Sequence, residues 1–325
     1  MRLSKAEKEE IIQLVERSEL GITKTLKELG IHKGTFYRWH KAYLNKSEIE
    51  KAIVRPSRRQ WNTIPEVQKN LVVEIALEHP ELSPRELAVK LTDEQRIFIS
   101  ESSVYRILKA KGLITSPTHI LLSASNEFRD KTAFVHQMWQ TDFTYFKILG
   151  WGWYYLSTVL DDYSRFIVHW ELCESMKAED VQRTLDHAIE KAALVKQQRP
   201  KVLSDNGSCY IASELKDYLE AKQITHIHGR PLHPQTQGKI ERYHRSMKNV
   251  VKLENYYYPE ELNAALETFV HHYNHERYHE SLDNVTPADV YYGRKEQILK
   301  QREKIRQQTM LKRRVLYQTE KLLSI

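Results

Sequence analysis

The sequence predicts two small helical regions followed by a mixed α/β domain. Apolar residues recur at helical spacing within residues 1–45 and again within 65–114. From about residue 134, aromatic and β-branched runs are separated by turn residues, which is typical of short strands. After about residue 178, helical and extended patterns alternate, which favours a layered domain with helices packed on a sheet.

Residues 1–45 have the pattern of three short helices. Gly30 marks a turn, and Phe36, Trp39 and Tyr43 form one apolar face of the third helix. A short helix, a glycine turn and a helix with a basic outer face are typical of a helix-turn-helix domain, although other three-helix bundles give the same pattern. The predicted DNA contacts on the outer face are Lys33, Arg38 and Lys41.

Residues 65–114 repeat this organisation. Ser83 and Glu86 flank a proline at the first helical position, which predicts a capping box. A later helix, ended by Gly112, would bury its apolar face. Two such units in tandem indicate a second helix-turn-helix domain. Its predicted DNA contacts are Ser103, Arg106 and Lys109.

Two linkers and a tail complete the expected organisation. Residues 46–64 form a basic linker, either a solvated connector or an arm that follows DNA phosphates or the minor groove. Its predicted DNA contacts are Arg55, Arg58 and Arg59. Residues 115–133 are polar and broken by turn residues, so they mark a second linker. The basic tail, 294–325, has the pattern of either a helix on DNA or a second subunit, or a partly disordered segment.

The charge distribution restricts where nucleic acid can bind. The chain carries a net charge of +7 and has a pI near 9.1, which suits an anionic partner. Residues 294–325 contain ten Lys/Arg and three Asp/Glu, so the remaining chain has 40 of each sign out of totals of 50 and 43. DNA contacts in the body of the protein must therefore be local.

Cysteine content and hydropathy indicate the cellular compartment of the protein. Cys173 and Cys209 form no CxxC pair and no disulfide framework, which favours a reducing environment. No apolar run reaches the roughly 18 residues of a membrane span, and the charged N-terminus lacks the apolar core of a signal peptide. We expect a cytoplasmic protein with no membrane partner.

Residues 134–293 predict a ribonuclease-H-like α/β domain. Three strands within 139–172 would form antiparallel hairpins, and two further short strands are expected at 201–204 and 224–227. Helices are expected near 178–195, 211–221, 237–254 and 259–277. The predicted fold is thus a mixed five-stranded sheet with helices on both faces.

Three acids in this domain stand where a purely structural acid is hard to explain. Asp142 interrupts an aromatic strand, Asp205 follows a short apolar strand, and Glu241 begins a helix. Carboxylates are the ligands that Mg²⁺ prefers, and two divalent ions about 3.5–4 Å apart activate a nucleophile and stabilise a leaving oxygen. The set predicts metal-assisted cutting or joining of phosphodiesters. A rival pair, Asp161 and Asp162, is expected to cap a turn.

The chain resembles the integrase-core transposases of bacterial insertion sequences, which are relatives of retroviral integrases. Thirty-five residues separate Asp205 from Glu241, the spacing of this family's Asp-Asp-Glu signature. The matching segments are Trp-Gln-Thr-Asp (139–142), Leu-Asp-Asp-Tyr-Ser-Arg (160–165), Ser-Asp-Asn-Gly (204–207), His-Pro-Gln-Thr-Gln-Gly-Lys-Ile-Glu (233–241), Tyr-Asn-His-Glu-Arg-Tyr-His-Glu-Ser-Leu (273–282) and Thr-Pro-Ala (286–288).

The resemblance implies a reaction and its cofactors. Asp142, Asp205 and Glu241 would hold two Mg²⁺ ions, for which Mn²⁺ can substitute. Water would cleave at the element's end to free a 3′-hydroxyl, which then attacks target DNA. Arg245 and Lys248 share a helical face with Glu241 and are predicted to contact DNA, as is Gln237.

Partners and location also follow from the resemblance. The substrates would be the terminal inverted repeats of the element and the target DNA, both double-stranded. Bringing two ends together requires at least a dimer. A bacterial cytoplasmic location, with action at the nucleoid, is implied.

Three other interpretations of the sequence are less favoured. A DNA-binding regulator with an inactive core would suit the tandem helix-turn-helix units, but all three acids are present. A structure-selective or RNA–DNA hybrid nuclease would not need two duplex-binding domains. A zinc site at His271, His272, His275 and His279 is disfavoured, since no cysteine is near and the segment matches a family motif.

Overall fold

The computed structural model describes residues 5–18, 20–49, 60–114, 132–195, 198–229, 237–252 and 254–323. The chain divides into two compact units. One comprises Met1–Ile120 with Lys300–Ile325, and the other comprises Leu121–Leu299. In the described ranges, no helix is long and apolar enough to cross a membrane.

The first helical domain has a small core. Ile12 and Val15 of the first helix pack with Leu26 of the second and Phe36 of the third, and all four are buried. The third helix continues beyond residue 45, where the sequence placed the start of a linker. The helices are α1 (Lys5–Arg17), α2 (Ile22–Glu28) and α3 (Lys33–Ile49).

The second helical domain has a larger core and a confirmed capping box. The Ser83 hydroxyl accepts from the Glu86 backbone N–H, and the Glu86 carboxylate accepts from the Ser83 N–H. This reciprocal pair satisfies two donors at the helix start. The helices are α4 (Glu66–Glu78), α5 (Pro84–Gln95) and α6 (Glu101–Ala110), around a core of Val72, Ile75, Leu87, Ala88, Leu91, Ile99, Val104 and Leu108.

The basic tail forms a helix, α13 (Lys295–Leu323), and not a partly disordered segment, while contact with DNA or with a second subunit stays a prediction. Its later turns pack against the second helical domain. Arg302 pairs with Asp93 at 2.6 Å, and buried Arg313 donates to Gln68 and to the backbone carbonyl of Phe98. Residues from Lys300 onward therefore complete the second helical domain.

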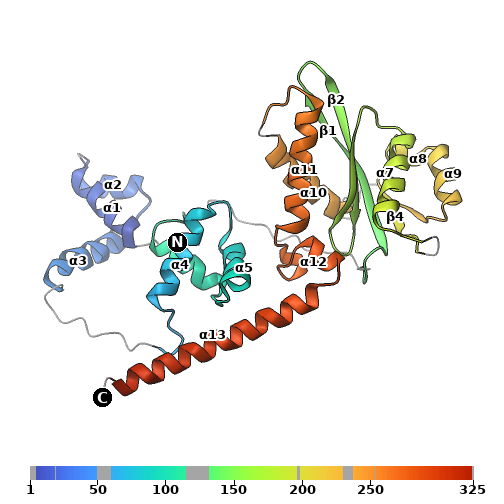
Figure 1. The fold of residues 1–325 in the computed structure, drawn as a ribbon. Coiled ribbons are helices and arrows are strands. Elements are labelled where there is room, and N and C mark those ends of the chain that lie inside the picture. Colours follow the sequence, from blue (N-terminus) through green and yellow to red (C-terminus); the bar gives the residue numbers. More distant parts are fainter. Residues whose placement is uncertain are drawn as a thin grey trace. The chain divides into compact units, whose positions relative to one another are not determined.

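The other unit contains a mixed five-stranded sheet, as predicted (Figure 1). The strand order is β3-β2-β1-β4-β5, with antiparallel pairing from β1 to β3 and parallel pairing of β4 with both β1 and β5. The strands are β1 (Met138–Ile148), β2 (Gly152–Asp161), β3 (Ile167–Cys173), β4 (Lys201–Ser204) and β5 (His226–His228).

Helices cover both faces of this sheet (Figure 1). α10 (Gly238–Val251) and α11 (Pro259–His275) pack on one face, around Leu156, Leu160 and Met247. The other face holds α7 (Ala178–Lys191), α8 (Ser208–Ile211) and α9 (Ser213–Ala221). A 3₁₀ turn at Glu280–Leu282 and α12 (Pro287–Tyr291) follow α11. The core thus confirms the predicted fold class.

Candidate active site

Strand register brings Asp142 and Asp205 to the same level of the sheet. In the parallel pair of β1 and β4, Gln140 lies opposite Leu203. Asp142 and Asp205 each follow two residues later, where β4 has just ended. β1 lies in the middle of the sheet, and Asp142 pairs with Thr158 of β2, whereas Asp205 is exposed in the loop that follows β4.

Two buried side chains of α8 are affected by the charges of both carboxylates. Burial raises the pKa of the Cys209 thiol to about 11, and the charges of Asp205 and Asp142 raise it further. Burial and the Asp142 charge, with a smaller effect of Asp205, also raise the pKa of Tyr210. Both acids therefore raise the pKa of the same two side chains of α8.

The segment after β4 is a tight turn that shapes the Asp205 backbone. The Asp205 carboxylate accepts a 2.9 Å hydrogen bond from the Gly207 N–H. The Asn206 amide donates to the backbone carbonyl of Gly229 at the end of β5. A Cβ at position 207 would lie 3.0 Å from the Asp205 carboxylate, so glycine keeps that oxygen accessible.

Asp142 and Glu241 line one cleft, although they are far apart in sequence. Glu241 is exposed in the first turn of α10, which packs beside β1. The cleft has a volume of about 400 Å³ and is open to solvent. Its lining comes from β1 and α10 and comprises Asp142, Phe143, Thr144, Tyr145, Glu241, His244, Arg245, Lys248 and Asn249.

The donor set of this cleft fits divalent metal ions of the magnesium type. The lining of the cleft offers the carboxylate oxygens of Asp142 and Glu241, whereas Asp205 lies outside that lining, in the loop after the neighbouring strand β4. The oxygens of Asp142, Asp205 and Glu241 do not all lie within 4.8 Å of one another. The three acids therefore do not form a closed cage for a single ion.

His244 is a site residue that the sequence analysis missed. Its Nδ1 lies 3.3 Å from an Asp142 carboxylate oxygen, and its Nε2 lies 3.5 Å from the Thr158 hydroxyl. The ring is buried, and Thr158 faces Asp142 across the β1–β2 pair. His244 follows Glu241 by three residues, so helical spacing alone could have placed it on the side of the acid.

A buried polar brace joins the start of α10 to β1 and β2. Gln140 accepts a 3.1 Å hydrogen bond from the Ile240 N–H and donates a 2.7 Å bond to Asp162. Lys239 pairs with the same Asp162 carboxylate and donates to its backbone carbonyl at 2.9 Å. These contacts hold the residues immediately before Glu241 against the strand that carries Asp142.

The rival acidic pair divides into two structural roles. Asp161 accepts from the Ser164 hydroxyl and N–H and from the His136 N–H, which agrees with the predicted turn cap. Asp162 does more than cap that turn, because its carboxylate accepts hydrogen bonds from the Gln140 amide, the Lys239 ammonium and the Thr132 hydroxyl. Both acids are buried and fully engaged.

The predicted DNA contacts on α10 differ in exposure. Arg245 is exposed and Lys248 is half-buried, and both line the cleft with Asp142 and Glu241. The Lys248 ammonium lies 5.0 Å from the Tyr145 ring, and partial burial lowers its pKa. Gln237 is 7% exposed, and its side-chain nitrogen has no hydrogen-bond partner within the residues described.

The predicted contacts in the helical domains are also located. Lys33, Arg38 and Lys41 are exposed on α3. Arg106 is exposed on α6 and donates to Ser103 at 3.3 Å, while Lys109 lies 5.8 Å from the Tyr105 ring. The remaining three fall outside the described residues: Arg55, Arg58 and Arg59.

The histidines near the end of α11 make local ion pairs. The rings of His271 and His272 each approach the Glu276 carboxylate, at 3.4 and 3.1 Å. The His271 and His275 rings lie 4.9 Å apart. Across the ranges described, this cluster does not bring three ligand atoms together as a metal site requires.

Family comparisons agree with this architecture. Residues 134–234 match the family model of an integrase core domain, and residues 222–287 match a second model with the same description. Residues 2–52 and 35–108 match two models of a homeodomain-like domain. The chain thus contains a region similar to an integrase core domain and regions similar to homeodomain-like helix-turn-helix domains.

Curated relatives include retroviral polyproteins. A Gag-Pro-Pol polyprotein of squirrel monkey retrovirus is 32% identical over 114 residues, 35% of this chain and 6% of the polyprotein. That of mouse mammary tumor virus is 27% identical over 141 residues, 42% of this chain and 8% of the polyprotein. The chain therefore spans less than a tenth of the length of these relatives.

Solved structures include an intasome. A simian T-cell lymphotropic virus intasome, in complex with the PP2A regulatory subunit B56 gamma, matches with a TM-score of 0.44 and 18% identity. The match covers 68% of this chain and 74% of that chain.

Proposed function

We propose that this protein is a DNA transposase. It binds the ends of an insertion sequence, cleaves to free a 3′-hydroxyl, and joins that hydroxyl to target DNA by transesterification. The observation that carries the proposal is the shared cleft of Asp142 and Glu241, with Asp205 at the level of Asp142 on the next strand. The helix-turn-helix domains supply duplex binding that a nuclease of this fold would not need.

The acids have the chemistry of a metal-binding set. Asp142, Asp205 and Glu241 would hold Mg²⁺ or Mn²⁺, in a pair, through carboxylate oxygens. Such ions lower the pKa of an attacking water or hydroxyl and stabilise charge on the leaving oxygen. Asp142 is the most rigid of the three because it lies on a central strand.

The other cleft residues act on the DNA and on the acids. Arg245 and Lys248 place positive charge beside Glu241, where they would hold phosphates of the element end. His244 fixes the orientation of the Asp142 carboxylate by approaching one of its two oxygens. The brace of Gln140, Lys239 and Asp162 holds the start of α10, so Glu241 stays on the correct side of the cleft.

The helical domains would bring the element ends to this site. We propose that the basic faces of α3 and α6, with Lys33, Arg38, Lys41 and Arg106, contact the terminal inverted repeats. Joining two ends to one target requires at least two copies of the chain. Affinity for the ends should fall steeply with salt, since phosphate contacts release counterions.

The test is strand transfer with purified full-length protein, Mg²⁺ and a labelled duplex bearing the element's own end. The wild type should produce joined products, and Glu241→Gln should produce none while it still shifts the duplex on a gel. Glu267→Gln is the matched control, since it makes the same change at an exposed acid on α11. It should join DNA as the wild type does.

Two results would contradict the proposal. Equal joining by Glu241→Gln and the wild type would remove this acid from the site. Specific end binding without joining by the wild type, in Mg²⁺ and Mn²⁺ alike, would favour a DNA-binding regulator that carries an inactive core.

A further inference from the structure

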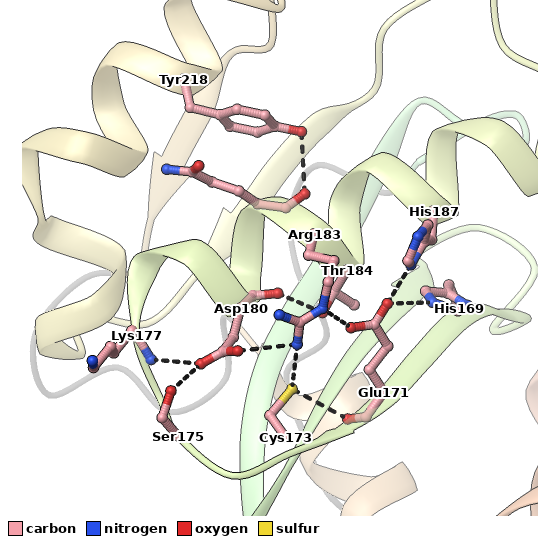
Figure 2. Close-up of polar contacts among 11 residues, drawn as sticks. His169, Glu171, Cys173, Ser175, Lys177, Asp180, Arg183, Thr184, His187 and Tyr218 are labelled. Atoms are coloured by element: carbon pink, nitrogen blue, oxygen red, sulfur yellow. Dashed lines mark hydrogen bonds and ion pairs between the residues drawn. The ribbon is translucent and has the colours of Figure 1, made fainter.

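A second group of potential metal ligands lies away from the acidic cleft, between β3 and α7 (Figure 2). β3 is an edge strand of the sheet, and α7 packs against it. His169 and Glu171 are two residues apart on β3, so their side chains point to the same face. His187 reaches them from α7.

Three ligand atoms converge in this group. His169 Nε2 lies 3.0 Å from Glu171 Oε1, and His187 Nδ1 contacts that same oxygen. All three atoms lie within 4.8 Å of one another. Ligand atoms around a tetrahedral zinc ion lie roughly 3.3 Å apart, since Zn–N and Zn–O bonds are about 2.0–2.2 Å long. The spacing therefore suits zinc with only small side-chain movements.

The second oxygen of Glu171 is already held by the protein. Arg183 donates from Nε to Glu171 Oε2 at 2.8 Å, and its Nη2 pairs with Asp180 at 3.0 Å. Asp180 in turn accepts from the Ser175 hydroxyl and the Lys177 N–H (Figure 2). This chain fixes the carboxylate with Oε1 directed at the two imidazoles, as outer-shell partners do at metal centres.

The imidazoles are suited to bind through defined atoms. The His169 side chain is only 10% exposed, and its Nδ1 has no hydrogen-bond partner within the described residues. Only Nε2 can therefore engage a ligand in common with Glu171. His187 is 48% exposed and leaves an entry path from solvent.

Charge and ligand type distinguish this group from the acidic cleft. Glu171 and Asp180 carry two negative charges against one on Arg183, so the group is net anionic when both rings are neutral. Two nitrogens and one oxygen favour zinc over magnesium, whereas the all-oxygen cleft favours magnesium. The two sites would therefore prefer different ions.

We propose that His169, Glu171 and His187 form a zinc site with water in the fourth position. The ion would fasten the edge strand β3 to α7 and replace the two contacts that the imidazoles make to a single carboxylate oxygen. It takes no part in the chemistry of the acidic cleft, so this proposal is independent of the transposase function.

The test is zinc binding to the full-length protein in the Asp142→Asn, Glu241→Gln background with excess Mg²⁺, which suppresses zinc binding at the acidic cleft. Titration calorimetry should give one bound Zn²⁺, and Co²⁺ should give the visible spectrum of a tetrahedral site. His187→Ala should weaken zinc binding at least tenfold. His271→Ala is the matched control, because His271 is also an exposed helix histidine paired with a glutamate, and it should bind zinc as the background does.

A thermal melt provides a second measurement. Zinc should raise the melting temperature of the background protein and of His271→Ala, but not that of His187→Ala, since a ligand stabilises only the folded state that binds it. Circular dichroism without metal should show that His187→Ala is folded. No zinc binding by the background protein, or equal binding by a folded His187→Ala, would overturn the proposal.

Discussion

Two pairs of acids in the same sheet have opposite surroundings. Asp161 and Asp162 are 0% and 2% exposed, and together they receive six hydrogen bonds from side chains and backbone N–H groups of five other residues. Asp142 and Asp205 are more exposed and have one described partner each, His244 and the Gly207 N–H. The carboxylate oxygens of Asp161 and Asp162 are occupied by hydrogen bonds within the fold. Asp142 and Asp205 keep carboxylate oxygens available for a ligand.

This difference distinguishes the carboxylates that stabilise the fold from the carboxylates that can bind a ligand. A buried carboxylate must be compensated by the protein, or burial is prohibitively costly. A metal-binding carboxylate must keep oxygens without hydrogen-bond partners. It therefore lowers the stability of the folded protein until a metal ion binds. The two pairs predict opposite effects of mutation: loss of stability for Asp161 and Asp162, and loss of chemistry for Asp142 and Asp205.

The largest expected effect is on catalysis. Asp142→Asn should lower strand joining by a factor of about 10³ or more, because a charged ligand of the metal pair is lost. The melting temperature should stay equal or rise, since repulsion from Asp205 is relieved. Strand-transfer rates and thermal melts on the same preparation measure both. A marked loss of stability would mean that Asp142 is a structural acid like Asp161.

The next effect is on stability. Asp161→Ala should cost about 3 kcal/mol of unfolding free energy, because the Ser164 N–H and the His136 N–H lose their buried acceptor. Urea unfolding measures it, and Asp217→Ala, at an exposed acid on α9, is the control. A change as small as that of the control would refute the structural role.

A smaller effect is expected at the brace. Lys239→Met should cost about 2 kcal/mol, since Asp162 keeps a buried charge without its cation. Joining should also slow, because the helix start before Glu241 is loosened. Adding Asp162→Asn should restore part of both losses. A double-mutant cycle checks this, and strictly additive effects would show that the two residues do not act together.

The smallest effect concerns His244. His244→Gln should slow joining by about tenfold, equivalent to about 1.4 kcal/mol, since the orientation of Asp142 becomes less restricted. DNA binding should not change, because no phosphate contact is removed. Joining rates measured at saturating DNA separate an effect on the joining step from an effect on DNA binding. An affinity loss with an unchanged joining rate would instead assign His244 to the DNA surface.

Much of the core could be predicted from sequence because its patterns are strong. The strand at 201–204 has the predicted limits, and the five-stranded sheet follows from aromatic and β-branched runs with clear turns. Of the predicted acids and the predicted DNA contacts on and beside α10, Asp142, Glu241, Arg245 and Lys248 line the cleft, whereas Asp205 and Gln237 do not. Regular spacing on β1 and α10 made this possible.

The remaining contacts depend on distant pairs that leave no periodic signal. Gln140 and Ile240, or Lys239 and Asp162, lie far apart in sequence and meet only in the folded sheet. His169, Glu171 and His187 likewise come together through the packing of α7 on β3. Asp162 was expected to cap a turn because nothing nearby in sequence indicates its partner on α10.

The packing of α13 has a consequence for synthesis. Residues 60–114 leave the ribosome early, but the helix segment that supplies Arg302, Thr309 and Arg313 to this domain is made only after the whole α/β core. The second helical domain therefore cannot reach its final structure on the nascent chain. Under the proposed function, recognition of element ends by this domain would be delayed until the α/β core has been translated, so an incomplete chain would not occupy the ends before it can join them.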